Sequence, residues 1–437
     1  MEYIVLGAFS LLLFLCLALN IPILWALVGG LLLFTVYGLL KGFSAREVAS
    51  FSLDGVKTVK NILITFVLIG VMTALWRGAG TIPMIVCWAI RLIRPPVFLL
   101  MTFLLNCMIS VLTGTAFGTS ATMGVICATM GMSLGVSPFL TGGAVLAGAY
   151  FGDRCSPVST SALLVATLTK TDIFSNIRHM IRSAAVPFVL SCAVYTVVGV
   201  LTQGSGEVPD LSAIFAAGFR LHWVTVLPAV VLLVLAVLRV KVKLAMTASI
   251  CTAIPICLLV QQTAAADLPR LMVLGYAAQD AQIASMLNGG GIVSMAKVVA
   301  IVCISSAYSG IFQKTGLLEG IKAGIHVLSR RTTPYIAAAV TAAVTGVIAC
   351  NQTLMIMLTH QLCCETDADA ERFALTLEDT AVVIAPLIPW SIACEVSLTS
   401  VGAPLHAIFF ACFLYLLPIR RCITALVEKK RCAAIQE

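Results

Sequence analysis

Residues 113–124 read T-G-T-A-F-G-T-S-A-T-M-G, and residues 148–162 read G-A-Y-F-G-D-R-C-S-P-V-S-T-S-A. Glycine and hydroxyl residues in both stretches, with Pro157 in the second, interrupt apolar segments of membrane-spanning character, and the acid Asp153 stands among them. A helix that breaks inside a bilayer frees backbone carbonyl groups, and these must face protein or water rather than lipid. The two stretches therefore predict broken or re-entrant helices around a polar site at membrane depth.

A second pair of interrupted stretches follows in the other half of the chain. Residues 346–353 read G-V-I-A-C-N-Q-T, and residues 377–395 read L-E-D-T-A-V-V-I-A-P-L-I-P-W-S-I-A-C-E. Pro157-Val158-Ser159 and Pro389-Trp390-Ser391 are separated by 389 minus 157, or 232, residues. Matched interruptions in two halves of a membrane protein are typical of the solute site of a secondary transporter.

The composition around these stretches requires lipid as the main solvent. Of the 437 residues, 60% are hydrophobic and 11% are charged, whereas a soluble domain carries roughly 25% charged residues. We therefore predict an all-α polytopic membrane protein with about ten to twelve transmembrane helices. The clearest predicted spans are 3–19, 21–40, 61–76, 96–113, 184–202, 221–238, 243–261, 292–312, 333–349 and 403–419.

The order of these spans and interruptions divides the chain into five predicted segments. Residues 1–60 hold the N-terminal spans and an amphipathic helix, and residues 61–202 the first transporter repeat. Residues 203–291 form a linker with connecting spans, residues 292–419 the second repeat, and residues 420–437 a basic tail. Amphipathic patterning in 43–60 and 173–182 predicts that these parts lie on the membrane surface.

The net charge of +8 reflects basic residues at the ends of apolar runs. This placement is the positive-inside pattern, so we place 41–60, 239–243 and 420–431 in the cytoplasm and the acidic loop 203–211 outside. It predicts a multi-pass protein of the cytoplasmic membrane with both termini cytoplasmic. No basic-aromatic stripe or nucleic-acid motif is present in the sequence, so we expect no nucleic-acid partner.

Oxygen-bearing side chains at the interruptions are the candidate site residues, namely Asp153, Ser156, Ser159, Thr160, Asn351, Thr353, Glu378, Asp379 and Ser391. Ionisable residues at membrane depth are costly and mark ion or substrate paths. Hard oxygen donors suit sodium, and we assign a sodium-binding role to Asp153 and Asp379.

Each assignment has a structural alternative. Asp153 could pair with Arg154, the serines could cap helices, and Asn351 and Thr353 could bond between helices. The acids at 378 and 379 could begin a helix.

Other chemistries find no support in the sequence. The 16 cysteines are scattered through apolar runs without a paired metal-binding pattern, and buried cysteine behaves as a small hydrophobe. The sequence lacks the H-E-x-x-H, G-x-S-x-G and P-loop motifs that carry metalloprotease, hydrolase and nucleotide chemistry. We therefore expect neither an enzyme nor an ATP-driven pump, and no cofactor apart from sodium ions and protons as transported or coupling ions.

Three motifs, G-T-A-F-G-T, F-G-D-R-C-S-P-V-S and L-E-D-T-A with A-P-L-I-P-W-S, occur in one order along the chain. Together they resemble the signature stretches of the NhaC-type sodium/proton antiporter family, within the wider ion-transporter superfamily, over nearly the whole chain. The resemblance implies two inverted repeats whose broken helices meet near the bilayer midplane, and sodium/proton exchange by alternating access. A homodimer is a reasonable expectation from the same superfamily.

The chain departs from the family pattern at three places. Ser159-Thr160-Ser161 stands where the family usually has Ser-Asp-Thr, so one membrane acid is absent. Ser391 replaces an asparagine after Pro389-Trp390, and Phe117 replaces a tryptophan. The missing acid weakens the expectation of proton exchange, so a sodium- or proton-coupled carrier of a small organic acid or amino acid stays open as the alternative.

Overall fold

The computed structural model describes residues 2–19, 21–92, 95–157, 159–202, 211–238, 240–280, 283–284, 287–317 and 322–436. Within these ranges the backbone is helical and holds no β-strand, apart from an isolated bridge between Tyr276 and Gly289. The predicted all-α class is confirmed.

The first part of the chain leads into two broken helix pairs. It begins with α1 (Glu2–Ala18), α2 (Ile23–Leu40), α3 (Ala45–Thr58), α4 (Lys60–Gly78) and α5 (Thr81–Leu92). After the 3-10 turn η1 (Pro95–Val97) come α6 (Phe98–Thr113), α7 (Ala116–Thr119), the π-helical turn η2 (Ser120–Gly124), α8 (Val125–Ser133), α9 (Pro138–Cys155), α10 (Thr160–Thr169) and α11 (Ile173–Leu201).

The middle of the chain connects the halves through α12 (Leu211–Gly218), η3 (Trp223–Val226), α13 (Leu227–Val237), α14 (Val242–Pro255), η4 (Ile256–Val260), α15 (Leu268–Leu274), η5 (Ile292–Met295), α17 (Ala296–Thr315) and α18 (Lys322–Arg331). The last part holds α19 (Pro334–Ala349), α20 (Gln352–Cys363), α21 (Ala370–Leu377), η7 (Glu378–Val382), η8 (Ala385–Leu387), α22 (Ile392–Ser400), η9 (Leu405–Phe410) and α23 (Cys412–Gln436).

Several helices have the length and apolar character of membrane spans. Three helices qualify singly, at Ile173–Leu201, Lys243–Val260 and Ile292–Phe312. Two helix pairs qualify together across a sharp bend, α4 with α5 at 66° and the α21–η8 run with α22 at 56°. Six shorter apolar helices accompany them in the described part of the chain. The protein is thus a multi-pass membrane protein with broken helices.

Besides the bend between α4 and α5, four breaks interrupt the described helices, in the same order in each half. Gly114 ends α6 and Cys350 ends α19, both in the left-handed backbone region, at φ 65° and 55°. Ser159 begins α10 and Ser391 begins α22, each with its hydroxyl accepting hydrogen bonds from backbone amides of the first turn. The local geometry therefore repeats where the sequence predicted paired interruptions, whereas the inversion of the two repeats stays a prediction.

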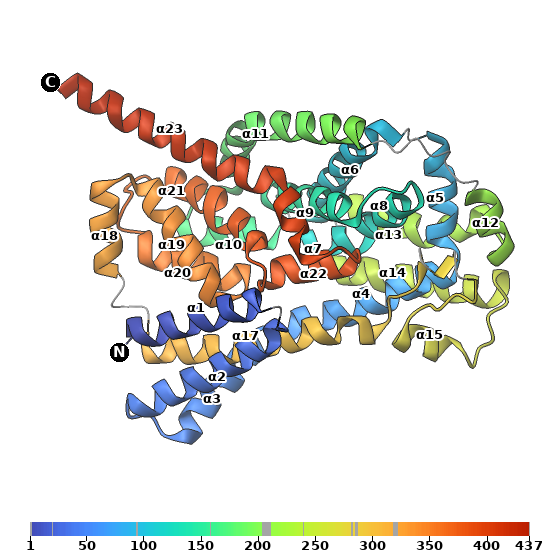
Figure 1. Ribbon diagram of the computed structural model, residues 1–437, viewed down its shortest axis with the longest axis horizontal. Helices are drawn as coiled ribbons and strands as arrows, with labels where there is room; N and C mark the ends of the chain where they lie inside the picture. Colours follow the sequence, from blue (N-terminus) through green and yellow to red (C-terminus); the bar gives the residue numbers. More distant parts are fainter. Residues whose placement is uncertain are drawn as a thin grey trace.

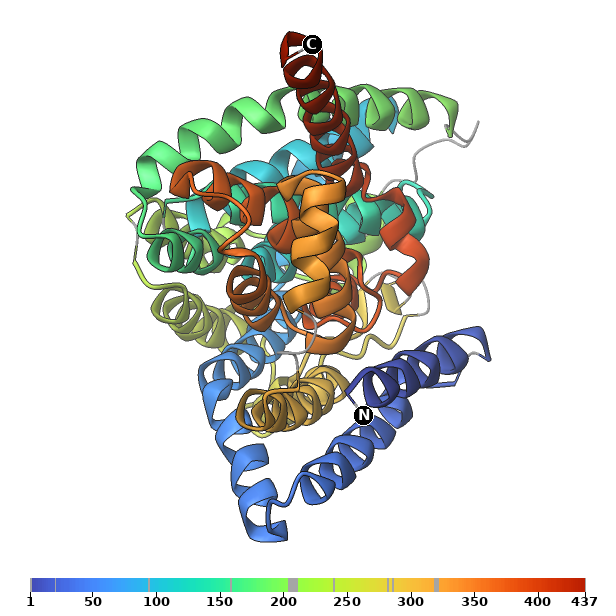
Figure 2. The ribbon, with the colours of Figure 1, turned by 90° about the vertical axis from the view of Figure 1, so that its left-hand side faces the viewer.

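The broken helices occupy the middle of the molecule. In Figure 1, α11 and α23 run along the upper edge, α1, α2, α3, α4 and α17 form the lower part, and α7–α10 and α19–α22 lie between them. Figure 2 shows α1 and α2 lying together along α17 at one side of the molecule. In this packing α2 and α3 of residues 1–60 contact α17, at the start of the predicted second repeat. The packing does not test the division into five predicted segments.

One predicted surface segment is part of a longer helix, and two other predicted loop segments fall at least partly outside the described residues. Residues 173–182 are not a separate surface segment, because they form the first turns of the single 29-residue helix α11. The same helix continues without a break through the apolar residues that follow, and the whole helix qualifies as a candidate membrane span. The loop at 203–210 and Arg239 lie outside the described residues.

The amphipathic helix α3 packs closely on α17 instead of only lying on the membrane surface. Its start is set by a capping box between Ser44 and Glu47. Gly55 of α3 and Gly310 of α17 face each other, so that a Cβ on Gly55 would lie 2.0 Å from the Ser306 carbonyl oxygen. Glycine at this crossing lets the two backbones approach, as small residues do between membrane helices.

Changing Gly55 to alanine should therefore destabilise the protein by about 1–3 kcal/mol, because the added methyl group would overpack a backbone contact. Thermal unfolding in detergent, followed by tryptophan fluorescence, measures the change. Gly7→Ala on α1 is the matched control, since a Cβ there meets nothing within 4 Å. Equal melting temperatures for the two variants would contradict the close crossing of α3 and α17.

Candidate functional site

Asp153 lies near the end of α9, at the break that precedes α10. Its side chain is buried, and its two carboxylate oxygens accept hydrogen bonds from two hydroxyl groups, Ser159 Oγ at 3.0 Å and Ser161 Oγ at 2.9 Å. The predicted pairing alternative with Arg154 is not seen, because the Arg154 guanidinium contacts other groups. Asp153 is thus a buried carboxylate held by neutral donors.

Groups from two further breaks face the same carboxylate. The Ala116 amide belongs to the break between α6 and α7, and the Gln352 side chain to the break between α19 and α20. Gln352 also donates to the Val382 carbonyl oxygen at 3.1 Å. Three of the four breaks therefore converge on Asp153, and they come from both halves of the chain.

A cavity of about 550 Å³ opens between the same breaks. Its lining includes Thr160, Asn351 and Thr353 from the predicted site, together with Gly114 and Thr115 from the first break. Thr65, Phe117, Thr122, Lys241, Lys243 and Gln352 also line it. The cavity lining combines residues with hydroxyl and amide side chains, two lysines and apolar residues, as ligand cavities commonly do.

The hydroxyl and amide residues at the breaks serve first as helix caps. The Ser159 hydroxyl accepts from the Ser161 and Ala162 amides, Asn351 Oδ1 from the Leu354 amide, and Ser391 Oγ from the Ala393 amide. Ser156 Oγ instead donates to the Val111 carbonyl oxygen at 2.7 Å. The capping alternative is therefore confirmed for Ser159 and Ser391, and Asn351, for which bonds between helices were the alternative, also caps a helix. The capping oxygens of Asn351 and Ser391 each accept one such bond and keep a lone pair, so capping does not exclude contact with a ligand there.

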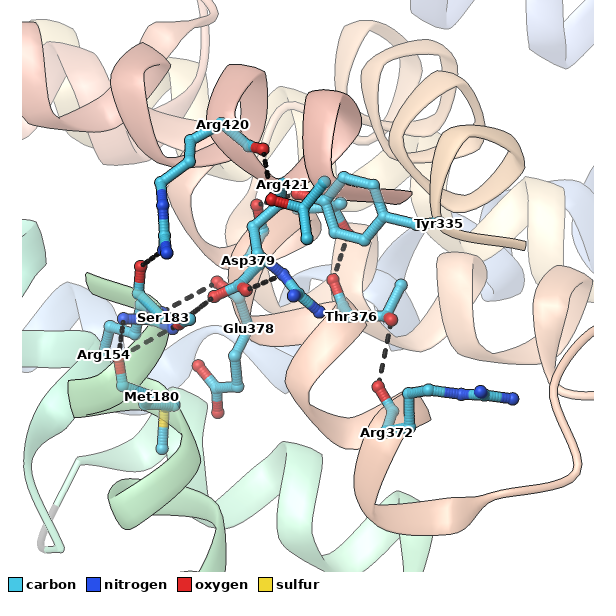
Figure 3. Close-up of polar contacts among 12 residues, drawn as sticks. Arg154, Met180, Ser183, Tyr335, Arg372, Thr376, Glu378, Asp379, Arg420 and Arg421 are labelled. Carbon is cyan, nitrogen blue, oxygen red and sulfur yellow. Dashed lines mark hydrogen bonds and ion pairs between the residues drawn. The ribbon is translucent and has the colours of Figure 1, made fainter. Parts of the chain in front are cut away.

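Asp379 belongs to a separate buried charge cluster. Arg154 and Asp379 form an ion pair with both side chains fully buried, and Arg421 Nε lies 3.0 Å from Asp379 Oδ2. Ser183 Oγ donates to Asp379 Oδ1 at 3.1 Å. Figure 3 shows the Asp379 carboxylate between Arg154, Ser183 and Arg421.

These contacts argue against sodium binding at Asp379, which stays a prediction. Neither Asp153 nor Asp379 lines the cavity, but the two oxygens of Asp379 face two guanidinium groups. A cation would have to displace one arginine and leave it buried without a counter-charge, which is costly. The sequence analysis considered Arg154 only as a possible partner of Asp153, and it included Arg421 only as part of the basic tail. It linked neither arginine to Asp379. Only the crossing of α9, α11 and α23 at η7 reveals their common partner.

Glu378 has a different environment although it precedes Asp379 in the chain. Its side chain is fully buried, and neither carboxyl oxygen has a hydrogen-bond partner among the described residues. In Figure 3 the Glu378 carboxyl points away from the Asp379 cluster. It also does not line the cavity.

The sequence analysis missed two groups that contact the Asp153 carboxylate. Ser161 was noticed only as part of a departure from the family pattern, and Gln352 only as an interruption of an apolar run. The high density of polar side chains at the breaks could have pointed to both residues. The direction in which each side chain points, however, depends on how its helix is rotated about its axis. Glu395, also noted as an intramembrane acid, pairs with Lys297 of α17 at 2.6 Å.

Comparisons with known proteins agree on a single family. A family model described as the Na+/H+ antiporter family matches residues 1–170 and 148–425. The chain is 27% identical over 402 residues to the Na(+)/H(+) antiporter NhaC of Alkalihalophilus pseudofirmus, covering 89% of this chain and 86% of that protein. It is 28% identical over 328 residues to the malate-2H(+)/Na(+)-lactate antiporter of Bacillus subtilis, covering 73% and 69%. The arginine/ornithine antiporter ArcD of Halobacterium salinarum is 27% identical over 363 residues, with 78% and 73% covered.

Replacing Arg154 by methionine should lower stability by about 3–5 kcal/mol, because Asp379 would lose a fully buried partner. Thermal or denaturant unfolding in detergent measures the loss. Lys57→Met, which breaks the exposed pair of Lys57 with Asp54, is the control and should cost less than about 1 kcal/mol. Combining Arg154→Met with Asp379→Leu should recover much of the loss. An Arg154→Met protein as stable as wild type would contradict the structural role of the pair.

Proposed function

The chain belongs to the Na+/H+ antiporter family, and from this membership we propose that it exchanges sodium ions for protons, with Asp153 as the carboxylate that binds them in turn. The observation that carries this assignment is the convergence of three helix breaks on one buried carboxylate, which forms no ion pair with an arginine or lysine among the described residues. The inner site consists of Asp153, Ser159 and Ser161, and the cavity lined by Thr160, Asn351 and Thr353 is its access path.

The chemistry of exchange follows from the cost of burying a charge. A carboxylate taken out of water without a counter-charge is strongly unfavourable, so Asp153 holds either a proton or a cation. The carboxylate and the Ser159 and Ser161 hydroxyls are hard oxygen donors, which suit sodium better than soft ligands would. Because a single carboxylate serves both ions, sodium binding expels the proton and proton binding expels sodium.

Contacts between the halves support a site that both halves build. Tyr150 of α9 donates to the Ala393 carbonyl oxygen of α22 at 2.9 Å. Arg154 Nε of α9 donates to the Glu378 carbonyl oxygen at the start of η7, at 3.2 Å. A relative movement of these elements would change access to Asp153, as alternating access requires.

The membrane setting completes the proposal. We place the protein in the cytoplasmic membrane with both termini in the cytoplasm, because the basic segments 41–60 and 420–431 follow the positive-inside pattern. The ions are cargo and no cofactor is needed. A homodimer remains part of the proposal on superfamily resemblance alone.

Exchange of a small organic acid is the second candidate, and one observation favours it. Lys241 and Lys243 line the cavity beside the break residues, and ammonium groups there would attract a carboxylate. A relative of this chain is named a malate-2H(+)/Na(+)-lactate antiporter. The chain also carries Thr160 in the cavity where the family usually has an acid, so a negative charge that would repel an anion is absent there.

Asp153→Asn should abolish sodium-dependent proton movement, because the amide binds neither a proton nor sodium in place of the carboxylate. Protein in liposomes with a trapped pH dye and an imposed proton gradient, challenged with sodium, lithium or potassium, measures the exchange. Glu47→Gln, at an exposed helix cap, is the control and should behave as wild type. Full exchange by Asp153→Asn would reject Asp153 as the exchanging group.

Lys241→Gln should separate the two candidate functions. If organic anions are carried, loss of this charge should lower their uptake by about tenfold or more, since a charge-assisted contact contributes about 1.5–3 kcal/mol. Uptake of labelled malate and lactate into the same liposomes measures this, with sodium/proton exchange followed in parallel. No malate or lactate uptake by wild type, together with intact cation exchange, would exclude transport of these two acids.

A further inference from the structure

A second cavity, of about 240 Å³, lies beside the cavity of about 550 Å³ described above. Eleven of its twelve lining residues are hydrophobic, and the exception is Thr122, whose hydroxyl donates to the Gly118 carbonyl oxygen at 2.7 Å. Its lining includes Trp76, Trp88, Thr122, Ala229, Val230 and Leu232. We call this cavity the apolar recess, because no charged side chain is among the described residues that line it.

The apolar recess reaches the lipid-facing surface of the protein. Trp88 of α5 and Val230 of α13 line it and are 45% and 43% exposed. Thr81–Trp88 completes a bent candidate span with α4, and Trp223–Leu235 is one of the shorter apolar helices. In Figure 1, α5 lies at the right of the molecule, and it contacts both α8 and α13. Because surfaces of such apolar segments face hydrocarbon, the recess opens into lipid and not into water.

The buried part of the apolar recess meets the larger cavity. Thr122 and Leu232 line both cavities, and both side chains are buried. Trp76 also lines the recess and is only 1% exposed, and its indole nitrogen donates to Ser249 Oγ at 2.9 Å. The recess therefore extends from the lipid-facing surface to the wall that it shares with the larger cavity.

Hydrocarbon is the ligand that suits this lining. A dry apolar cavity of about 150 Å³ in another protein binds benzene, so the apolar recess has room for a comparable stretch of hydrocarbon. Water would find too few polar partners there, and an ion would lose its hydration without compensation. If the recess stayed empty, the side chains that line it would lack dispersion contacts on one side.

We propose that the apolar recess binds one acyl chain of a membrane lipid, which enters between Trp88 and Val230 and ends against Thr122 and Leu232. The bound chain supports the wall between the two cavities from the lipid side. The site is separate from Asp153 and its break residues, and it does not depend on which solute the protein exchanges.

Fluorescence quenching of Trp76 tests for the bound chain. Full-length protein that retains Trp76 as its sole tryptophan is reconstituted into phosphatidylcholine vesicles with brominated acyl chains, since bromine quenches a nearby indole. We expect this buried tryptophan to lose most of the fluorescence that it shows in unbrominated vesicles. Ala229→Phe in the same protein should restore most of it, because Ala229 is buried in the lining and a phenyl ring there would occupy the recess.

A control on the same helix makes the outcome decisive. Val234 is 50% exposed and does not line the recess, so Val234→Phe should leave the quenching unchanged. Absence of quenching in the parent protein, or equal quenching in Ala229→Phe and its parent, would overturn the acyl-chain site.

A second measurement covers variants that fold poorly. If a phenyl ring overpacks the recess, Ala229→Leu replaces it, and the difference between wild type and Trp76→Phe isolates the Trp76 signal without the other substitutions. A ligand that binds the folded protein raises its melting temperature, so added phosphatidylcholine should stabilise delipidated wild type in detergent more than Ala229→Leu. An equal rise in both proteins would contradict the site. Neither measurement involves ion exchange, so the result is independent of the proposed function.

Discussion

The need to satisfy backbone polar groups inside a lipid environment constrains the whole structure. Each of the four helix breaks leaves amides and carbonyls without intrahelical partners, and no water is available in the bilayer core to bind them. The protein meets this need with side-chain caps and with bonds between breaks, such as that from the Ile392 amide to the Cys350 carbonyl oxygen. The breaks consequently lie in the middle of the molecule, surrounded by continuous helices.

Once the breaks are buried together, charge becomes the next constraint. Two solutions occur within one buried region of the protein. Asp379 is neutralised permanently by Arg154 and Arg421, which ties α9, η7 and α23 together. Asp153 is held by the Ser159 and Ser161 hydroxyls, which stabilise a carboxylate without neutralising it. The first arrangement suits a fixed part of the structure, and the second leaves room for an exchangeable positive ion. Asp153 and Asp379 are the same type of residue, so the difference between their roles comes from the groups that contact them.

The cavity shows how one architecture serves related cargoes. Its polar lining comes from break residues of both halves, whereas Lys241 and Lys243 come from the connecting region. Relatives of similar identity carry names for sodium/proton, malate/lactate and arginine/ornithine exchange. In this chain the helix breaks meet beside the cavity, and under the proposed function the side chains that line it would select the solute.

The sequence by itself determined the class of the protein, the positions of its breaks and its family. Helix breaks are encoded locally, since glycine, proline and capping residues act on the backbone within a few positions, and apolar length is a property of a continuous segment. For this reason Gly114, Ser159, Asn351 and Ser391 were found at helix ends as predicted. Only the tertiary structure decided which acids face which partners. The Arg154–Asp379 pair joins residues far apart in the sequence, the Ser161 and Gln352 contacts to Asp153 depend on helix rotation, and Glu378 differs from Asp379 only by pointing elsewhere. Such directions follow from how helices pack against each other, which no local pattern records.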